Sequence, residues 1–268
     1  MATDPGPYLA MNPAIEPKDT YWSRQSRALR PFGIWGAYIA VFVTHIIVRS
    51  FADSIFSPHS PAAIDRLIVG TNPAAWLQAR IYGNAILIDK MATGAHMLWF
   101  AFPFAVGMYI TVRRQDLLVR YFGWLTVAWF VCDVIFALVP ASPPWMVDDH
   151  VTRILFTQGW VDYVGVDTNP VAAFPSLHAC IPFVIGFFVT VNMREARWLA
   201  GLSFGFGLLV GASVIYIGEH WLVDVFAGYF VATSIAFGAV RLGTRKGAAL
   251  PNAIAKAETK NVKRREAA

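Results

Sequence analysis

Two histidines in this chain stand in segments whose residue types could carry phosphoryl chemistry. One segment is the run Phe174-Pro-Ser-Leu-His178, and the other runs Ser213-Val-Ile-Tyr-Ile-Gly-Glu-His220-Trp-Leu-Val-Asp224. Residues four apart share one face of a helix, so the carboxylate of Asp224 can accept a hydrogen bond from His220. Such a carboxylate fixes the tautomer of the imidazole and stabilises the positive charge that develops on it. This arrangement is expected of an activated histidine nucleophile.

The other histidine segment adds the groups that a nucleophile needs around it. A second histidine, His178, can protonate a leaving oxygen, which contributes roughly 10²–10⁴-fold to a rate. Ser176 lies at the expected start of a helix, where its hydroxyl and the free N–H groups favour an anion. A lone histidine near the end of a membrane span is usually interfacial or hydrogen-bonded. Two histidines at the same membrane face, one of them with a carboxylate four residues away, favour a catalytic role over a structural one.

The elements that must position these residues are membrane helices. The chain is 56% hydrophobic and 15% charged, whereas soluble domains carry about 25% charged residues. A membrane helix needs about 20 mostly apolar residues. Six stretches fit this pattern, the first and fourth of them short: Phe32–Val48, Met91–Val112, Tyr121–Val139, Leu177–Val191, Trp198–Ile217 and Trp221–Val240. We therefore predict an all-α bundle of six transmembrane helices, in which His178 and His220 lie at the same membrane face.

The positive charges predict the orientation of this bundle. With six spans, most lysines and arginines fall on the side of the two termini, and five fall on the other side: Arg49, Arg66, Arg80, Lys90 and Arg153. The positive-inside rule then places both termini in the cytoplasm and the histidines at the extracytoplasmic face of the cell membrane. We expect a polar N-terminal tail over residues 1–31, a membrane domain over 32–240 and a basic tail over 241–268. We interpret that tail as facing lipid headgroups and expect no nucleic-acid partner.

Two long segments on the outer side are the places where function is expected. Residues 50–90 have the spacing of short interfacial helices, with breaks at Gly70–Pro73 and near Gly83. Residues 140–175 form the second long outer loop. Cys132 and Cys180 fall inside predicted spans, so we interpret them as packing residues and infer neither a disulfide nor a metal site.

The two histidine motifs resemble those of a known family. Pro-Ser-x-His at 175–178 and Ser-x6-His-x3-Asp at 213–224 are similar to the second and third motifs of the type 2 phosphatidic acid phosphatase superfamily, which shares its fold with vanadium haloperoxidases. Further segments resemble its inositol phosphorylceramide synthase-like branch: Asn169 to His178, Pro143-Pro144-Trp145, and Gly70-x2-Pro73-x2-Trp76-Leu77-Gln78 with Asp89 and His96. The resemblance covers residues 30–240.

The resemblance implies a role for each motif residue. His220 would attack phosphorus and form a phosphohistidine, and Asp224 would orient it. His178 would protonate the leaving alcohol and then activate water or an acceptor alcohol. Ser176 would bind a phosphoryl oxygen, and no metal or other cofactor would be needed.

The chain departs from the family pattern at the residues that hold phosphate. Leu177 replaces the usual glycine, and Val214 stands at the position of an arginine. Arg113 and Arg120 reproduce the spacing of the first family motif, but they lie in an inner loop on the wrong face. We therefore exclude them as phosphate ligands and choose among the five outer cations, with Arg153 first.

Four other polar residues complete the predicted site and its surroundings. Lys90 is a further candidate for phosphate binding, and His96 is expected to line the site or to bridge helices. Asp133 is either a proton relay or, in our preferred interpretation, a packing carboxylate. His45 is interpreted as structural.

We therefore predict a membrane enzyme that moves a phosphoryl group from a lipid phosphate ester to water or to an alcohol. One alternative is a headgroup transferase acting on a phosphodiester, which the missing arginine and lysine pattern weakly favours. A transporter or scaffold with the same fold is a second alternative, and a vanadate-dependent peroxidase is a third.

Overall fold

The computed structural model describes residues 21–157 and 169–242, and this part of the chain is helical without a β-strand. The helices are α1 (Tyr21–Arg49), α2 (Ala62–Val69), α3 (Pro73–Ile81), α4 (Ile86–Arg113), α5 (Leu118–Leu138), α6 (Pro144–Val147), α7 (Leu177–Asn192), α8 (Arg197–Tyr216) and a last helix, Leu222–Leu242. Short 3-10 turns occupy Gln115–Leu117, Ile154–Phe156 and Arg194–Ala196. The all-α prediction is confirmed.

Five helices within the described residues are long and apolar enough to cross a membrane, namely the outer part of α1, α4, α5, α8 and the last helix. The predicted fourth span, α7, has only 16 residues. That corresponds to about 24 Å at 1.5 Å per residue, less than the roughly 30 Å of a bilayer core. Helix α7 packs against α4, α5 and α8, and most of its side chains are buried in protein. The structure thus supports five long spans, and the sixth crossing stays a prediction.

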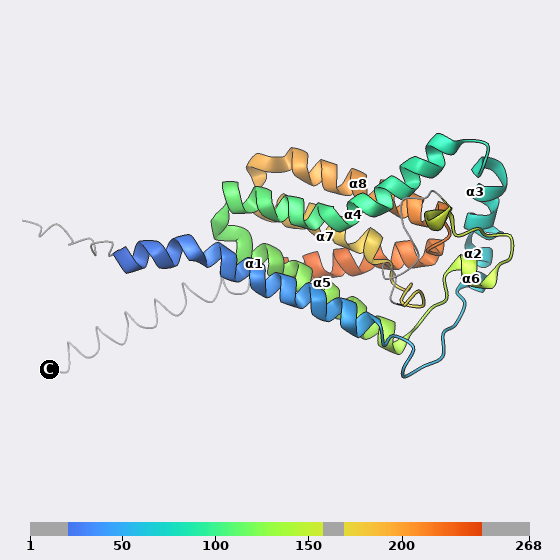
Figure 1. The fold of residues 1–268 in the computed structure, drawn as a ribbon, viewed down its shortest axis with the longest axis horizontal. Coiled ribbons are helices and arrows are strands. Elements are labelled where there is room, and N and C mark those ends of the chain that lie inside the picture. Colours follow the sequence, from blue (N-terminus) through green and yellow to red (C-terminus); the bar gives the residue numbers. More distant parts are fainter. Residues whose placement is uncertain (1–20, 158–168, 243–268) are drawn as a thin grey trace, which may run out of the picture.

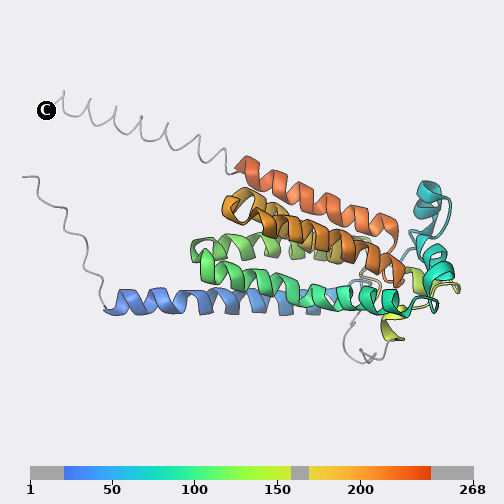
Figure 2. The ribbon, with the colours of Figure 1, turned by 90° about the horizontal axis from the view of Figure 1, so that it is seen from above.

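The helices are arranged so that the outer segments gather at one end of the bundle. Figures 1 and 2 show α2, α3 and α6 together at this end. The start of α1 and the end of the last helix lie at the opposite end (Figure 2). Helix α7 begins on the side of the bundle that carries α2, α3 and α6. His178 is the second residue of α7 and therefore lies near this end. The orientation of this bundle in the membrane stays a prediction.

The predicted breaks in the outer segment are confirmed, and each has a local cause. Helix α2 ends at Gly70, whose positive φ of 77° allows its N–H to bond back to Arg66. Helix α3 begins at Pro73, and the side chain of Asn72 caps it by accepting the N–H of Ala74. Gly83, with a φ of 76°, turns the chain into α4.

The tail predictions fall mostly outside the described residues. Residues 1–20 and 243–268 belong to the two predicted tails and lie outside the part that the structure describes. Helix α1 already begins at Tyr21, well before the predicted domain start at residue 32.

The last helix approaches α7 so closely that one position between them must be glycine. A Cβ added at Gly228 would lie 2.3 Å from the carbonyl oxygen of Ser176 and 3.1 Å from the Cβ of Ala179. These atoms belong to the backbone and first turn that carry His178, so they cannot yield without moving that turn. We expect Gly228→Ala to destabilise the protein by about 1–3 kcal/mol through overpacking.

The same helix provides the control for this prediction. Gly238 has nothing within 4 Å of an added Cβ. Gly238→Ala should therefore leave the stability unchanged or raise it, since alanine favours a helix by about 1 kcal/mol over glycine. Thermal unfolding in detergent compares the two variants. Equal melting temperatures for both would show that the approach at Gly228 is looser than described.

Candidate active site

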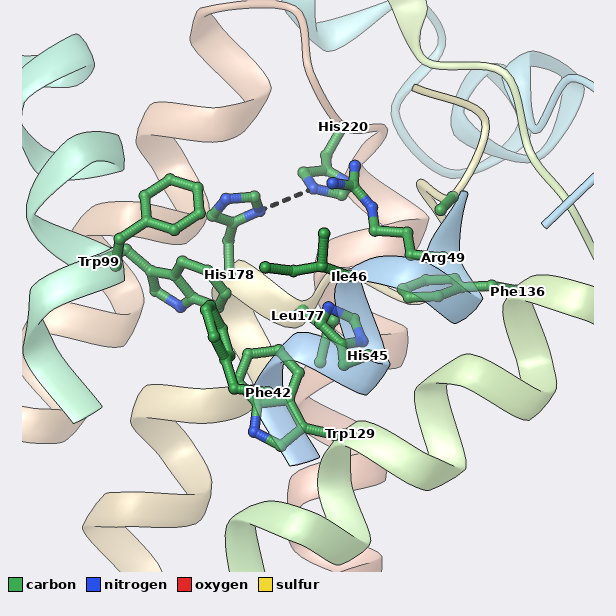
Figure 3. Close-up of a pocket in the computed structure, with 12 residues that line it drawn as sticks. Phe42, His45, Ile46, Arg49, Trp99, Trp129, Phe136, Leu177, His178 and His220 are labelled. Atoms are coloured by element: carbon green, nitrogen blue, oxygen red, sulfur yellow. Dashed lines mark hydrogen bonds between the residues drawn. The ribbon is translucent and has the colours of Figure 1, made fainter. Parts of the chain in front are cut away.

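The two predicted histidines are in direct contact near the end of the bundle that carries α2, α3 and α6 (Figure 1). The distance between Nδ1 of His178 and Nε2 of His220 is 3.1 Å, although 42 residues separate them (Figure 3). His178 is the second residue of α7, and His220 lies in the turn between α8 and the last helix. The expected juxtaposition is therefore present, because a helical hairpin returns the chain to the same end.

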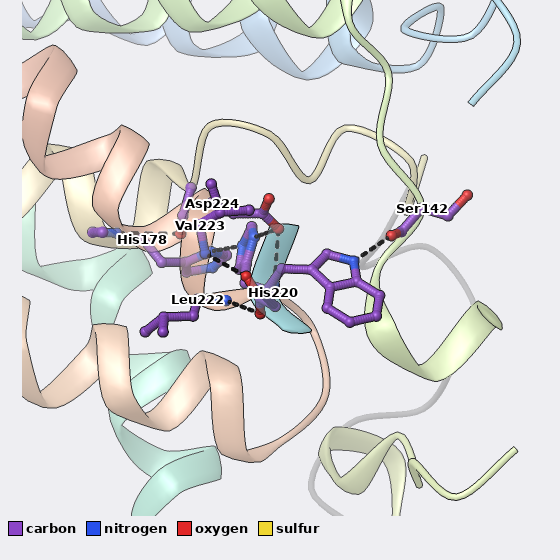
Figure 4. A network of polar contacts seen from close by, with 10 residues as sticks. Ser142, His178, His220, Leu222, Val223 and Asp224 are labelled. Carbon is purple, nitrogen blue, oxygen red and sulfur yellow. Dashed lines mark hydrogen bonds and ion pairs between the residues drawn. The ribbon is translucent and has the colours of Figure 1, made fainter. Parts of the chain in front are cut away.

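Asp224 lies behind His220 at the predicted spacing, in a fully buried position. Its Oδ2 is 3.5 Å from Nδ1 of His220, longer than an ordinary hydrogen bond. The same oxygen accepts the backbone N–H of Trp221 at 2.9 Å (Figure 4). The carboxylate is thus fixed by the start of its own helix, and it faces the ring nitrogen that points away from His178.

A second buried carboxylate, Asp65 of α2, fixes the turn that carries His220. Its two oxygens accept the N–H groups of Leu222 and Val223 at 2.8 and 3.0 Å (Figure 4). Burial raises the pKa of the Asp65 carboxyl above its usual range, although these two N–H groups oppose that shift. No local pattern predicts this role for Asp65, because its partners lie 157 and 158 residues further along the chain.

Ser176 has a different position from the one expected of a phosphate ligand. It is fully buried, and its Oγ accepts the N–H of Ala179 at 3.4 Å as the N-cap of α7. Its own N–H donates to the carbonyl oxygen of Asp224 at 2.9 Å. Ser176 therefore connects the two histidine segments, and it lines neither of the cavities described next.

Two cavities meet at the histidine pair. The larger has a volume of about 200 Å³ and is mostly aromatic and aliphatic; it is lined by Phe42, His45, Ile46, Arg49, Trp99, Phe100, Trp129, Phe136, Ala172, Leu177, His178 and His220. The smaller, of about 40 Å³, is lined by Arg49, His96, Phe100, Arg153, Leu155, Pro170, Ala172, Ala173, His178, Glu219 and His220. The histidine pair thus lines both a mostly apolar cavity and a smaller one that has more charged residues in its wall.

Of the outer cations, Arg49 and Arg153 reach this site. Arg49, at the end of α1, lines both cavities, and Figure 3 shows its guanidinium beside His220. Arg153 lines the smaller cavity, but its Nε and Nη2 donate to the two oxygens of Glu219 at 2.6 and 3.0 Å. Its guanidinium also lies over the rings of Trp145 and Phe156. Glu219 therefore compensates the charge of Arg153, and Arg49 is the better candidate for a phosphoryl oxygen because it lines both cavities.

Of the remaining residues considered for the site, His96 lines it, whereas Lys90 and Arg120 do not. The ring of His96 stacks on that of His178 with centroids 4.5 Å apart, so His96 does line the site. Lys90 is exposed on α4 and lines neither cavity. In the inner loop, Arg120 donates to the side chain of Asn192, at the far end of α7 from His178. This position agrees with its exclusion as a phosphate ligand.

Comparison with known proteins identifies the family. A family model described as the PAP2 superfamily matches residues 62–238, which include both histidines, Asp224 and all of the outer helices. The chain belongs to the PAP2 superfamily. The resemblance seen in the sequence is confirmed at this level, and the inositol phosphorylceramide synthase-like branch stays a prediction.

Individual relatives of this PAP2 protein match over shorter stretches. An uncharacterised protein of Methanocaldococcus jannaschii is 26% identical over 104 residues, which cover 39% of this chain and 40% of the relative. An undecaprenyl-diphosphatase of Sulfolobus acidocaldarius is 34% identical over 70 residues, 26% of this chain and 33% of that protein. The matches thus span less than half of either relative.

The chain is also similar to one solved structure. The match to the crystal structure of LpxE from Aquifex aeolicus covers 67% of this chain and 93% of the LpxE chain, with 15% sequence identity and a TM-score of 0.45.

The PAP2 site also contains a contact between His45 and Asp133, two residues that the sequence predicts to be structural. Nδ1 of His45 on α1 lies 2.6 Å from Oδ1 of Asp133 on α5, and His45 lines the larger cavity. No group of three or more His, Cys, Asp or Glu side chains is close enough to hold a metal ion within residues 21–157 and 169–242.

Proposed function

We propose that this PAP2 protein is a membrane lipid phosphatase or phosphotransferase that works through a phosphohistidine on His220. The contact of 3.1 Å between His178 and His220 carries this proposal. It joins a nucleophile and a proton donor at the point where an apolar cavity meets Arg49. Such a cavity with a few convergent polar groups is the usual form of a small-molecule site.

In the first step, Nε2 of His220 attacks phosphorus and the bond from phosphorus to the lipid oxygen breaks. His178 donates its proton to that oxygen, so the lipid alcohol leaves neutral. Asp224 stabilises the charge that develops on the His220 ring. In the second step, water or an acceptor alcohol gives its proton to His178 and attacks phosphorus, and the bond to His220 breaks.

The entering phosphoryl group must separate the two rings. Reacting atoms in a productive complex are roughly 3–3.5 Å apart, which leaves no space for phosphorus while His178 and His220 are hydrogen-bonded to each other. The hydrogen bond therefore opens when the substrate binds. Arg49 then lies where it can neutralise the phosphoryl oxygens, and this electrostatic contribution is usually the largest in such reactions.

Glu219 supports the second candidate function, transfer of a headgroup from a phosphodiester. It lines the smaller cavity beside both histidines, and its carboxylate compensates the charge of Arg153. Because this pair has no net charge, Arg153 offers little compensation to a dianionic monoester, whereas a singly charged diester needs less of it. The proposal thus includes both water and an alcohol as acceptors, at the extracytoplasmic face.

We expect the purified protein in lipid nanodiscs to release phosphate from lipid phosphate esters, or to form new phospholipids, in excess EDTA. Residues of the chain itself provide the nucleophile, the acid and the positive charge in the proposed mechanism. The assay offers a total lipid extract and follows inorganic phosphate and new phospholipids together.

Vanadate serves as the matched control, because it resembles the five-coordinate phosphoryl transition state and should inhibit competitively. Activity that disappears in EDTA and returns with added zinc would reassign the histidines as metal ligands. A protein that catalyses neither reaction under any condition would favour the transporter alternative.

A further inference from the structure

A buried histidine and carboxylate inside the bundle are not used by the proposed mechanism. His45 and Asp133 are bonded at 2.6 Å between α1 and α5, with side chains only 7% and 13% exposed. Ionisable groups within membrane helices are costly to bury, and they usually mark a functional site. The question is therefore what this pair could contact.

The position of His45 answers part of this question. Phe42, His45, Ile46 and Arg49 are spaced as one face of α1, and all four line the larger cavity. The ring of His45 also packs on Trp129 of the cavity wall, with centroids 4.4 Å apart. His45 is thus a polar group in a wall that is otherwise aromatic and aliphatic at this depth (Figure 3).

The pairing with Asp133 determines what His45 can recognise. Nδ1 is engaged with the carboxylate, which leaves Nε2 as the ring nitrogen for a ligand. When Nδ1–H donates to the carboxylate, Nε2 presents a lone pair and accepts a hydrogen bond. The matching group on a ligand is a hydroxyl or an amide N–H.

The depth of His45 locates this group on the lipid. His45 precedes Arg49 by four residues, or about 6 Å along the helix. A phosphoryl group beside Arg49 and the histidine pair would place the first carbons of the lipid alcohol at the level of His45. A polyprenyl alcohol has only hydrocarbon there, whereas a sphingoid or a lysoglycerol alcohol has a hydrogen-bond donor.

We propose that His45, oriented by Asp133, selects lipid phosphates whose alcohol carries a hydroxyl or amide N–H a few bonds from the phosphate. This inference rests on the proposed function of the site. His45 acts here as a specificity residue and takes no part in the bond changes at phosphorus.

The test compares four lipids in nanodiscs. Ceramide 1-phosphate and lysophosphatidic acid carry such a donor, phosphatidic acid offers only ester oxygens, and farnesyl phosphate offers neither. We expect kcat/KM to be roughly 10- to 100-fold higher for the preferred donor-bearing lipid than for farnesyl phosphate, the range of a hydrogen bond to a charge-assisted partner. Lysophosphatidic acid offers a hydroxyl alone, whereas ceramide 1-phosphate also offers an amide N–H, so the two lipids distinguish these two kinds of donor.

Two variants identify the origin of this preference. His45→Phe should remove it by lowering kcat/KM for the donor-bearing lipids alone. Asp133→Asn keeps the shape of the pair, but its amide can donate to Nδ1 and so place the proton on Nε2. The preference should then shift toward phosphatidic acid, whose ester carbonyl accepts a hydrogen bond. A residue with a merely structural role would lower the rate for all four lipids together.

A neighbouring position on the same helix gives the matched control. Thr44 is exposed, and its hydroxyl bonds to the carbonyl of Ala40 within α1. Thr44→Val removes a polar group beside His45 without touching the cavity, and it should leave the order of the four lipids unchanged.

A binding measurement separates this inference from the proposed function. Trp99 and Trp129 line the same cavity, so tryptophan fluorescence can report the binding of each lipid without turnover. Lipid binding that depends on His45 in a protein without turnover would refute the proposed function and keep this inference. Equal binding and equal turnover of all four lipids, unaffected by His45→Phe, would overturn the inference alone.

Discussion

Replacing His220 with alanine is expected to abolish turnover of lipid phosphate esters, with a loss on the order of 10⁶-fold, the effect of removing a catalytic nucleophile. The ring has the two partners that the proposed nucleophile needs. Its Nε2 faces the proton donor His178, and its Nδ1 faces the buried carboxylate of Asp224. Release of phosphate by the purified variant measures the loss. Near-normal activity in a correctly folded His220→Ala protein would refute the phosphohistidine mechanism.

The control for this variant is a histidine of the same outer region. His150 has a side chain that is 90% exposed, and it contacts only Asp148 among the ion pairs described. His150→Ala should keep full activity. Rapid quenching with a ³²P-labelled lipid phosphate should give a protein-bound label that is stable in alkali and labile in acid, and His220→Ala should give none.

The parts of the fold that the sequence predicts are those determined by local patterns. Long apolar runs define the helices, and the turn residues Gly70 and Gly83 define the breaks of the outer segment. The approach of His178 to His220 follows from topology, since two crossings return the chain to the same end. Contacts between residues that are close in sequence, or that a helical hairpin brings together, are therefore predictable from the sequence alone.

The choice among cations was not predictable in this way. Arg153 was preferred because it lies between two motifs, but its charge is taken up by Glu219, which is 66 residues away. Arg49 has no motif around it in the sequence, and only the packing of α1 brings it to the histidine pair. Contacts between distant residues decide which cation lies at the histidine pair, and a single sequence does not contain that information.

Ser176 and His45 illustrate the same limit at the level of side-chain direction. A serine at a helix start can face an anion or cap its own helix, and here its hydroxyl accepts the N–H of Ala179. His45 and Asp133 are 88 residues apart, and each read alone suggests packing. Their contact in a cavity wall changes the interpretation of both.

Replacing His178 with alanine is expected to produce a loss that depends on the leaving group. An alkyl alcohol is a poor leaving group and needs a proton as the bond to phosphorus breaks, so the rate should fall roughly 10²–10⁴-fold. A p-nitrophenyl ester leaves as a stable anion and needs little protonation, so its first step should change much less. The contact of His178 with Nε2 of His220 places it where this proton is needed.

The measurement must isolate the first step, because His178 also activates water in the second. In His178→Ala, p-nitrophenyl phosphate should therefore give a burst of nitrophenolate equivalent to the enzyme, followed by slow turnover as the phosphohistidine persists. An alkyl phosphate should give no burst of its alcohol, because its first step is itself slow without His178. His178 stacks on His96, so His178→Phe can test whether an aromatic ring without a proton restores packing but not the lipid reaction. Equal losses for aryl and alkyl esters in single-turnover experiments would show that His178 orients the substrate or the His220 ring and is not the general acid.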